Sequence, residues 1–294
     1  MNILCIGKSG QVARALAERS AEIGVECVCL GRPDLDLLDA HQIAAALDTR
    51  SPTVVVNAAA YTNVDGAESD QDAAFALNAD APGELAQQCR ARGLPLIHIS
   101  TDYVFDGSGE QAWRETDPTG PINVYGASKL AGEIAVREAH DQHVILRTSW
   151  VYSPFGANFA KTMLRLAKDR PELSVVDDQI GAPTGAIEIA NAILALAPQV
   201  VANTEKFGTY HFAAGGHGSW ADFAEEVFTL YEARSGKATK LSRIATEAYP
   251  TPARRPANSR LDTDKFAATF NHKPLDWRGG VRATVNRLLD QADG

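Results

Sequence analysis

Residues 3–13 read Ile-Leu-Cys-Ile-Gly-Lys-Ser-Gly-Gln-Val-Ala, a short apolar run followed directly by a glycine-rich turn. A continuous apolar run of this length is typical of a strand buried on both faces of a parallel sheet. Gly7 permits the tight turn, Gly10 lets the backbone approach a pyrophosphate, and the small Ala13 lets a helix pack on the strand. An ordinary glycine turn is the alternative, but the position right after an N-terminal strand favours dinucleotide binding at the helix N-terminus. The residues expected to contact the dinucleotide are Gly7, Gly10, Gln11 and Val12.

The first half of the chain continues as an alternation of strand-like and helical segments. Its expected strands lie at 25–30, 53–56, 94–99 and 144–146. Its expected helices lie after the glycine turn through residue 22, at 40–47, at 70–92 and from about 123. Such alternation implies a doubly wound parallel sheet with its ligand at the carboxyl ends of the strands. We therefore predict an α/β chain in which residues 1–150 form a Rossmann-like dinucleotide-binding domain.

The second half has a more mixed pattern. We expect helices at 158–168, 186–196 and 220–233 and strands at 173–179 and 208–212. The pattern predicts a smaller mixed α/β C-terminal domain over residues 151–294 that mainly holds the substrate. Residues from about 185 to 205 are expected to rejoin the first domain.

The bulk composition narrows the class of protein. The net charge of −9 over 294 residues does not favour nucleic-acid binding, which uses basic patches. The four cysteines lie in apolar or helical patterns without metal-ligand spacing, as expected for core thiols of a cytosolic protein. Met1 leads directly into the first strand, and no apolar run approaches the ~18 residues of a membrane span. We therefore expect a cytoplasmic protein with no signal peptide and no membrane or nucleic-acid partner.

One constellation predicts proton transfer. Tyr125 and Lys129 are four residues apart and share a helix face, and Thr101 follows an apolar run at a predicted strand end. A lone Tyr-x-x-x-Lys is usually a solvated helix face. Together with Thr101, the pair supplies a phenol, an ammonium group and a hydroxyl that can converge on one carbonyl oxygen. Such a set can move a proton while another group transfers a hydride.

Two loops are expected to complete the coenzyme site. No acidic residue stands at the tip of the second strand; Arg32 lies near it, either to pair with the 2′-phosphate of NADPH or as a solvated loop arginine. The choice between NADPH and NADH therefore stays open. Small residues after the third strand allow close approach of the backbone to a bound ring. The further expected coenzyme contacts are Asp36, Leu37, Ala58, Ala59, Ala60, Tyr61 and Thr62.

A proline-rich segment at 249–260 carries Arg254, Arg255 and Arg260. The prolines fix the loop, and the guanidinium groups are suited to binding anions. In an acidic protein, this local basic patch indicates a phosphorylated ligand.

These segments together resemble the dTDP-4-dehydrorhamnose reductase family of the extended short-chain dehydrogenase/reductase superfamily. The resemblance covers nearly the whole chain. Five of its segments are shared with several sugar-nucleotide enzymes, and they lie at 7–12, 56–62, 100–106, 123–129 and 147–152. The three that identify the narrower family lie at 159–164, 178–184 and 249–256.

The resemblance implies NAD(P)H-dependent reduction of the C4 ketone of dTDP-4-dehydro-L-rhamnose to dTDP-L-rhamnose. It makes Tyr125 the proton donor, and makes Lys129 the group that holds the nicotinamide ribose and lowers the Tyr125 pKa toward neutrality. Thr101 would bond the same substrate oxygen. The expected substrate contacts are Thr101, Asp102, Tyr125, Trp150 and Arg254.

Departures from the family and alternative functions complete the prediction. Some members bind magnesium through glutamates at a dimer interface, and the matching positions here hold Ala15, Ile187 and Arg287. We therefore expect no metal, and a monomer or weak homodimer. The alternatives are a sugar-nucleotide epimerase or dehydratase, or a non-catalytic NADP-binding regulatory subunit. The pair Asp102-Tyr103 in place of Asp-Glu argues against a dehydratase.

Overall fold

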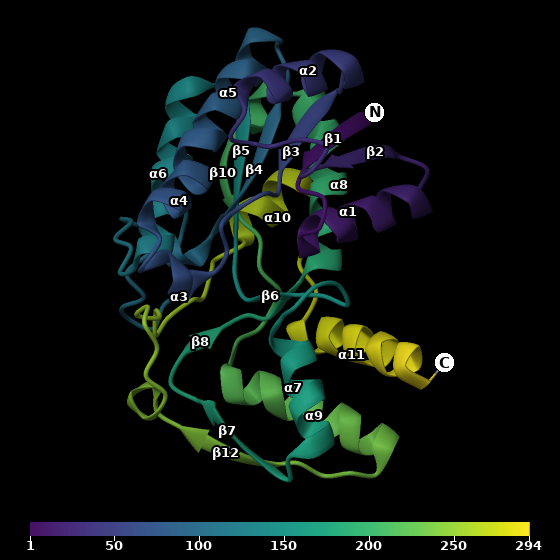
Figure 1. The fold of residues 1–294 in the computed structure, drawn as a ribbon, viewed down its shortest axis with the longest axis vertical. Coiled ribbons are helices and arrows are strands. Elements are labelled where there is room, and N and C mark those ends of the chain that lie inside the picture. Colours follow the sequence, from purple (N-terminus) through teal and green to yellow (C-terminus); the bar gives the residue numbers. More distant parts are fainter. Residues whose placement is uncertain (294) are drawn as a thin grey trace.

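A parallel six-stranded sheet, described with the rest of residues 1–293 in a computed structural model, organises the molecule (Figure 1). Its strand order is β10-β5-β4-β3-β1-β2, and every neighbouring pair is parallel. The predicted Rossmann-like doubly wound fold is confirmed. The strands are β1 (Asn2–Ile6), β2 (Glu26–Leu30), β3 (Val54–Asn57), β4 (Leu96–Thr101), β5 (His143–Thr148) and β10 (Gly208–His211).

The strand order reverses beside β1, and this reversal creates the binding crevice. β1 pairs with β2 on one side and with β3 on the other, so the loops after β1 and β3 diverge to opposite faces of the sheet. In open α/β sheets, ligands bind at such a switch point, outside the carboxyl ends of the strands.

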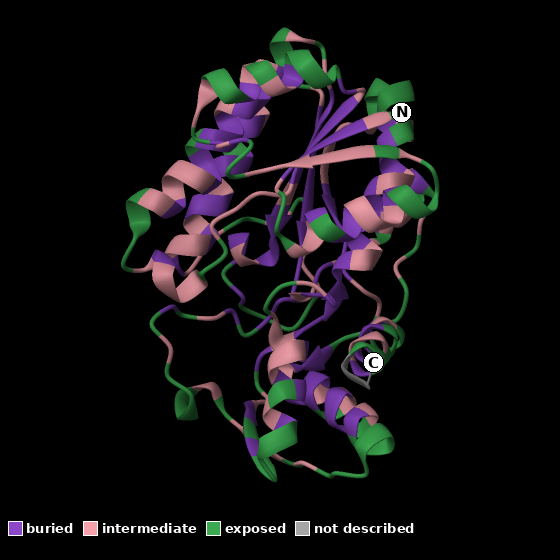
Figure 2. Cartoon of the chain, turned by 45° about the vertical axis from the view of Figure 1, so that its right-hand side comes forward, coloured by how far each residue is buried: buried purple, intermediate pink, exposed green. Residues whose placement is uncertain are grey.

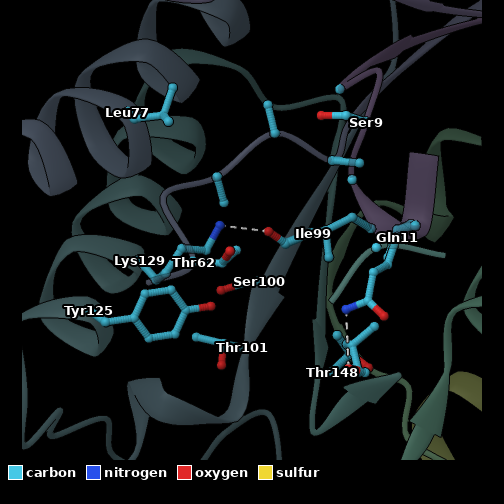
Figure 3. Close-up of a pocket in the computed structure, with 18 of the residues that line it drawn as sticks. Ser9, Gln11, Thr62, Leu77, Ile99, Ser100, Thr101, Tyr125, Lys129 and Thr148 are labelled. Atoms are coloured by element: carbon cyan, nitrogen blue, oxygen red, sulfur yellow. Dashed lines mark hydrogen bonds between the residues drawn. The ribbon is translucent and has the colours of Figure 1, made fainter. Parts of the chain in front are cut away.

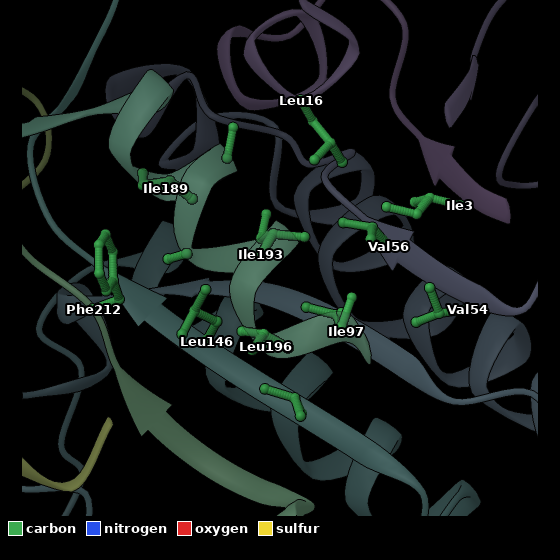
Figure 4. Packing of buried hydrophobic residues seen from close by; sticks show 14 of the residues in the cluster. Ile3, Leu16, Val54, Val56, Ile97, Leu146, Ile189, Ile193, Leu196 and Phe212 are labelled. Carbon is green, nitrogen blue, oxygen red and sulfur yellow. The ribbon is translucent and has the colours of Figure 1, made fainter. Parts of the chain in front are cut away.

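Helices cover both faces of the sheet. Alternate residues of β1 explain this, because Ile3 and Cys5 belong to one apolar core and Leu4 and Ile6 to the other. Figure 4 shows Leu16 of the first helix and Ile193 of α8 packed over the sheet. The helices are α1 (Gln11–Glu22) and α8 (Ala186–Ala202) on one face, and α2 (Ala40–Arg50), α5 (Ala81–Ala91) and α6 (Val124–Ala139) on the other. Buried residues concentrate on the strands and on the helix sides that face them (Figure 2).

The helical region predicted at 70–92 is interrupted. It comprises α4 (Gln71–Phe75), a π-helical segment η1 (Ala76–Asp80) and then α5, which has a proline in its first turn. π-helical turns inside helices often occur at functional sites. A short helix α3 (Val64–Ala67) precedes this region.

The second half builds a smaller lobe around its own apolar core. Three helices and the parallel pair β7–β12 form it, and two short strand pairs, β6–β9 and β8–β11, join it to the sheet region. The remaining elements of the second half of the chain, whether in this lobe or next to the sheet, are β6 (Val151–Tyr152), α7 (Phe159–Asp169), β7 (Glu172–Val176), β8 (Ile180–Gly181), β9 (Thr184–Gly185), β11 (Gly218–Ser219), α9 (Trp220–Ser235), β12 (Lys240–Ile244), α10 (Asp264–Phe270) and α11 (Trp277–Asp293). Single turns of 3-10 helix occur at η2 (Asp102–Val104), η3 (Thr204–Lys206) and η4 (Thr246–Ala248).

The chain returns to the sheet after entering the smaller lobe. α8 packs on α1, β10 pairs with β5, and Phe266 and Phe270 of α10 join the core on that face of the sheet. Within residues 1–293, no helix has both the length and the apolar character needed to cross a membrane.

Candidate active site

A cavity of about 960 Å³ opens at the carboxyl ends of β1, β3 and β4 and extends to the smaller lobe. This volume suits a large ligand, since pockets for small molecules span roughly 300–1,000 Å³. Most of the predicted site residues line it. They are Gly7, Gly10, Gln11, Val12, Arg32, Asp36, Leu37, Ala58, Ala59, Ala60, Thr62, Thr101, Asp102, Tyr125, Lys129 and Trp150.

The turn after β1 fits the pyrophosphate of a dinucleotide. Gly7 has a φ of +128°, and a Cβ there would lie 3.2 Å from the Ala58 carbonyl carbon, so only glycine suits the position. Gly10 is the N-cap of α1 and supplies no side-chain cap, and the first turn carries no acidic residue. The N–H groups at this helix N-terminus therefore face the cavity without a competing carboxylate, which favours an anion.

The Gln11 side chain has a second set of contacts that the sequence did not indicate. Its amide donates to the Val151 carbonyl over 3.3 Å, and its oxygen accepts from Ser153 over 2.8 Å and from Asn158 over 3.0 Å. Figure 3 shows this side chain extended toward the segment after β5. Gln11 thus joins the glycine turn to the segment that leads into α7.

Arg32 lies at the edge of the cavity beside Asp36. Its guanidinium donates twice to the Asp36 carboxylate, over 3.0 and 3.1 Å. These hydrogen bonds lower the pKa of Asp36. Asp36 therefore balances the positive charge at this edge.

The loop after β3 places its residues differently from the prediction at one position. Ala58, Ala59, Ala60 and Thr62 line the cavity, whereas Tyr61 does not. The backbone of Tyr61 is held by Asn78 of η1, whose amide accepts from the Tyr61 N–H over 2.8 Å and donates to its carbonyl over 3.1 Å. Asn78 is buried and was not predicted; its signal was a polar residue inside an apolar helical pattern.

Thr101, Tyr125 and Lys129 lie together on one wall of the cavity (Figure 3). Asn123 caps α6 by accepting from the Gly126 N–H over 2.7 Å, which fixes where Tyr125 emerges. Lys129 donates to the Ile99 carbonyl over 2.8 Å. α6 and the end of β4 therefore bring the three functional groups to one place.

The pKa of Tyr125 differs from the value expected from the sequence. Burial raises the pKa of Tyr125 to about 12, against a hydrogen bond with Thr101 that lowers it. Burial lowers the pKa of Lys129 to about 8, against the attraction of Glu133. The expectation that Lys129 lowers the Tyr125 pKa toward neutrality is wrong for the protein on its own, because desolvation of the phenolate outweighs every other effect.

Two buried polar atoms of residues that line the cavity lack a hydrogen-bond partner within residues 1–293. Asp102 accepts from Thr101 through one carboxylate oxygen over 3.1 Å, and its other oxygen has no partner within residues 1–293. The Thr148 hydroxyl also lacks one there. Burial raises the pKa of Asp102 to about 7. Buried polar groups of this kind are usually satisfied, so a polar ligand at this wall would fit them.

The proline-rich loop reaches the cavity through Arg255 rather than Arg254. The Arg254 side chain is exposed and does not line the cavity; the Arg254 carbonyl accepts from Asn123 over 2.8 Å. Arg255 lines the cavity and makes two 2.8 Å hydrogen bonds to Asp65. The structure thus brings Arg255, and not Arg254, to the cavity, since neighbouring residues of an extended loop point in different directions.

Aromatic side chains form the wall contributed by the smaller lobe. Trp150 and Trp220 are stacked with ring centroids 3.7 Å apart, and Phe159 packs against Trp220. Trp150 has a φ of +48°, an unusual backbone conformation for a bulky residue. Gly181 leaves room for this ring, because a Cβ there would lie 2.6 Å from it. Sequence reasoning identified Trp150 but not Trp220, which opens α9 far along the chain.

Among the described residues, no group of three or more His, Cys, Asp or Glu side chains is arranged to hold a metal ion. Arg287 of α11 forms an ion pair with Glu18 of α1 through two hydrogen bonds, of 2.5 and 2.7 Å.

The sheet and the cavity at its switch point define a protein of Rossmann-like fold. Residues 1–290 match the family model described as RmlD substrate binding domain. The chain belongs to the dTDP-4-dehydrorhamnose reductase family. A dTDP-4-dehydrorhamnose reductase of Sinorhizobium fredii is 46% identical over 291 residues, with 98% of each chain covered. Another, from Escherichia coli K12, is 44% identical over 296 residues, again with 98% of each chain covered.

Solved structures show the same relationship. The dTDP-4-dehydrorhamnose reductase of Bacillus anthracis in complex with NADP has a TM-score of 0.90 at 32% identity, covering 98% of this chain and 100% of its own. That of Clostridium acetobutylicum has a TM-score of 0.91 at 34% identity with the same coverage.

Proposed function

We propose that this protein reduces the C4 ketone of dTDP-4-dehydro-L-rhamnose to give dTDP-L-rhamnose, with NADPH or NADH as hydride donor. The observation that carries the proposal is the convergence of Thr101, Tyr125 and Lys129 on one wall of the cavity that begins at the glycine turn. The names of the full-length relatives support the choice of substrate, and the NADP complex of the Bacillus anthracis relative supports the coenzyme.

The coenzyme would lie along the carboxyl ends of the strands. The backbone at Gly10, Gln11 and Val12 would hold its pyrophosphate, and Ala58 to Ala60 would allow a close approach to its rings. When bound, the nicotinamide supplies the hydride. Lys129 is held against Ile99 and faces the cavity, where it would bind the nicotinamide ribose.

Tyr125 would supply the proton. Its raised pKa keeps the phenol protonated at neutral pH, so the proton is available for the alkoxide that forms at C4. Thr101 lies beside it and would hydrogen-bond the same oxygen, stabilising the developing negative charge. Asp102 lines the cavity beside Thr101 and would bind a hydroxyl of the sugar.

We propose that the chain divides as its cores suggest. Residues 1–150, with about 185–205, would form the coenzyme domain, and residues 151–294 would form most of the substrate domain. Separate apolar cores support this division, with Tyr210, Phe212, Phe266 and Phe270 of the second part also packed in the core of the first. Trp150, at the boundary between the two parts, and Arg255, in the second part, would contact the substrate. The cytoplasmic location and the monomeric or weakly dimeric state stay predictions, which cell fractionation and sedimentation would test.

The decisive test is to incubate the purified protein with the ketosugar nucleotide and either coenzyme, and to follow loss of the reduced nicotinamide absorbance. A reductase consumes one coenzyme for each ketone. An epimerase or dehydratase would instead retain NAD through purification and convert substrate without net consumption. A regulatory subunit would bind the coenzyme without turnover. If neither NADH nor NADPH is oxidised, the proposal fails.

A further inference from the structure

A buried hydrogen-bonded chain runs from Lys129 to the loop after β3. The Lys129 nitrogen lies 3.5 Å from Nε2 of His98, and Nδ1 of His98 lies 3.1 Å from the amide nitrogen of Asn57. The oxygen of the Asn57 amide accepts from the Ala59 N–H over 3.2 Å. His98 and Asn57 are fully buried, and Lys129 is 2% exposed. The chain thus links the cavity lysine to an alanine that lines the expected coenzyme site.

The Ala59 end sets the direction of the hydrogen bonds along this chain. The Ala59 N–H can only donate, so the Asn57 oxygen must face it and the Asn57 NH₂ group must face His98. His98 Nδ1 therefore accepts. Because a neutral imidazole carries its proton on the other nitrogen, Nε2–H of His98 points toward Lys129.

This direction discriminates between the two forms of Lys129. An ammonium group has three donors and no acceptor, so it would meet the Nε2–H of His98 donor to donor. An uncharged amine has one lone pair, which accepts from Nε2–H while an N–H of the amine donates to the Ile99 carbonyl. Only the uncharged amine satisfies every partner in the chain.

The charged groups around Lys129 do not reverse this preference. From its own helix, Glu133 attracts the ammonium but is itself paired with Arg147 of β5 over 2.7 Å and with Arg137. From β4 and β5, His98 and His143 face the site; burial, followed by the charges of Lys129 and His143, keeps the pKa of His98 well below its usual range. From η2, Asp102 acts on the Tyr125 side of the wall. From η1, the buried side chain that packs toward α6 is the uncharged Asn78, which donates to Ser128.

We propose that His98 is a positioning residue that joins Lys129 to the Asn57–Ala59 loop and, through the direction of its hydrogen bonds, favours the uncharged form of the Lys129 amine. The inference deepens the proposed function and rests on it for the role of Lys129 in turnover. It predicts that a change in the hydrogen bonds of the Asn57–Ala59 loop, which would seat the coenzyme, also changes the pKa of Lys129, which would bind the coenzyme ribose.

The charge of Lys129 can be measured without coenzyme or substrate. The ε-methylene of isotope-labelled lysine is titrated by NMR in the wild type, with Lys129→Met to assign the signal. In His98→Gln, the side-chain oxygen can accept from the Asn57 NH₂ group, so its own NH₂ group faces Lys129 and the direction of the hydrogen bonds is kept; the Lys129 pKa should change by less than about half a unit. His140→Gln is the matched control, since His140 is also buried and bonds a backbone carbonyl, that of Leu94, just before the amino end of β4.

A second variant reverses the direction of these hydrogen bonds while keeping a polar side chain at every position. In Asn57→Asp, the carboxylate accepts both from Ala59 and from His98 Nδ1, which moves the imidazole proton away from Lys129 and should raise the Lys129 pKa by roughly one unit. An unchanged Lys129 pKa in a folded Asn57→Asp protein overturns the proposal. A rise in Asn57→Asp but not in His98→Gln or His140→Gln supports it.

The pH dependence of kcat/KM then tests whether the hydrogen bonds from Lys129 to Ala59 affect turnover. Reduction needs the lysine charge to hold the ribose, so kcat/KM should fall as pH rises through the Lys129 pKa. This descending part of the pH profile should move to higher pH in Asn57→Asp by the same amount as in the NMR titration. If the Lys129 pKa measured by NMR moves but the pH profile of kcat/KM does not, the proposed role of His98 holds and the proposed role of Lys129 in turnover fails. Failure of this inference can therefore be told apart from failure of the proposed function.

Discussion

Asp65 and Arg255 are 190 residues apart in the sequence, yet the guanidinium of Arg255 makes a 2.8 Å hydrogen bond to each oxygen of the Asp65 carboxylate. The same carboxylate accepts from the Ala253 N–H over 3.1 Å. These bonds attach the proline-rich loop to α3, beside the expected coenzyme loop. Arg255 therefore holds the loop in place and also presents positive charge to the cavity.

Arg255→Ala should raise the KM for the sugar nucleotide by about 10- to 100-fold, because it removes a charged hydrogen-bond donor from the cavity wall and releases the loop. Arg254→Ala is the matched control. The Arg254 side chain is exposed, so its removal should change KM by no more than about twofold. Steady-state kinetics of both variants would check this, and equal effects of the two substitutions would contradict it.

Tyr125→Phe should reduce kcat by roughly 10²- to 10⁴-fold while coenzyme affinity stays close to that of the wild type, since only the proton donor is lost. Tyr103→Phe is a useful comparison, because Tyr103 packs edge-to-face on Tyr125 with centroids 5.6 Å apart and keeps that contact as phenylalanine. Its kcat should change less than about tenfold. Single-turnover measurements with saturating coenzyme would separate the two, and near wild-type turnover in Tyr125→Phe would place the donor elsewhere.

Gly132→Ala should destabilise the fold by about 1–3 kcal/mol or more, because a Cβ at Gly132 would lie 1.9 Å from the Asn78 carbonyl oxygen and force α6 away from η1. Gly279→Ala is the control on another helix. A Cβ at Gly279 meets nothing within 4 Å, so alanine should be neutral or stabilising by up to about 1 kcal/mol. Urea denaturation would measure both. Equal midpoints for Gly132→Ala and wild type would show that the contact yields without cost.

His211 should make stability depend on acidity. It is buried next to Arg147, with Nδ1 3.0 Å from the Trp113 carbonyl, and burial lowers its pKa from 6.5 to about 3. A lowered folded-state pKa means that the unfolded chain binds the proton more readily. The contribution is complete above pH 6.5 and is lost as pH falls toward 3, by at most about 1.4 kcal/mol per pH unit.

His211→Asn should therefore flatten the fall in stability between pH 6.5 and 3 relative to the wild type. Thermal melts of both proteins across this range would show it, because other titrating groups contribute equally to the two curves. Parallel curves would mean that His211 does not carry the effect.

The local elements were largely predictable because the sequence carries their signals locally. The run before Gly7 and the Asn123 cap set β1 and the start of α6 within a residue or two. The pairing of β10 with β5 was not predictable, since any buried apolar segment satisfies the pattern of a central strand and the choice of neighbour is made by tertiary packing. The π-helical turn at η1 was also missed; the Asn78 within it makes long-range hydrogen bonds to Tyr61 and Ser128, which no local pattern indicates.

The candidate site shows the same limit at the scale of single residues. The Gly7 turn, Thr101 and Tyr125 were indicated by residue type and by position at strand or helix ends. Arg255 and Trp220 were not, because whether a loop arginine or a helix-opening tryptophan faces the cavity depends on the path of the chain through the smaller lobe. The pKa of Tyr125 depends on burial, which spacing does not reveal.

The return of the chain to the sheet through α8, β10 and α10 also determines which fragments of this protein can fold on their own. A fragment ending near residue 150 would lose β10 and α8, leaving β5 as an open sheet edge and exposing the apolar face that α8 covers. Such a fragment is a candidate for aggregation rather than a working coenzyme-binding module. Substrate specificity in this architecture is therefore changed more readily by replacing loops in place than by exchanging whole halves between proteins.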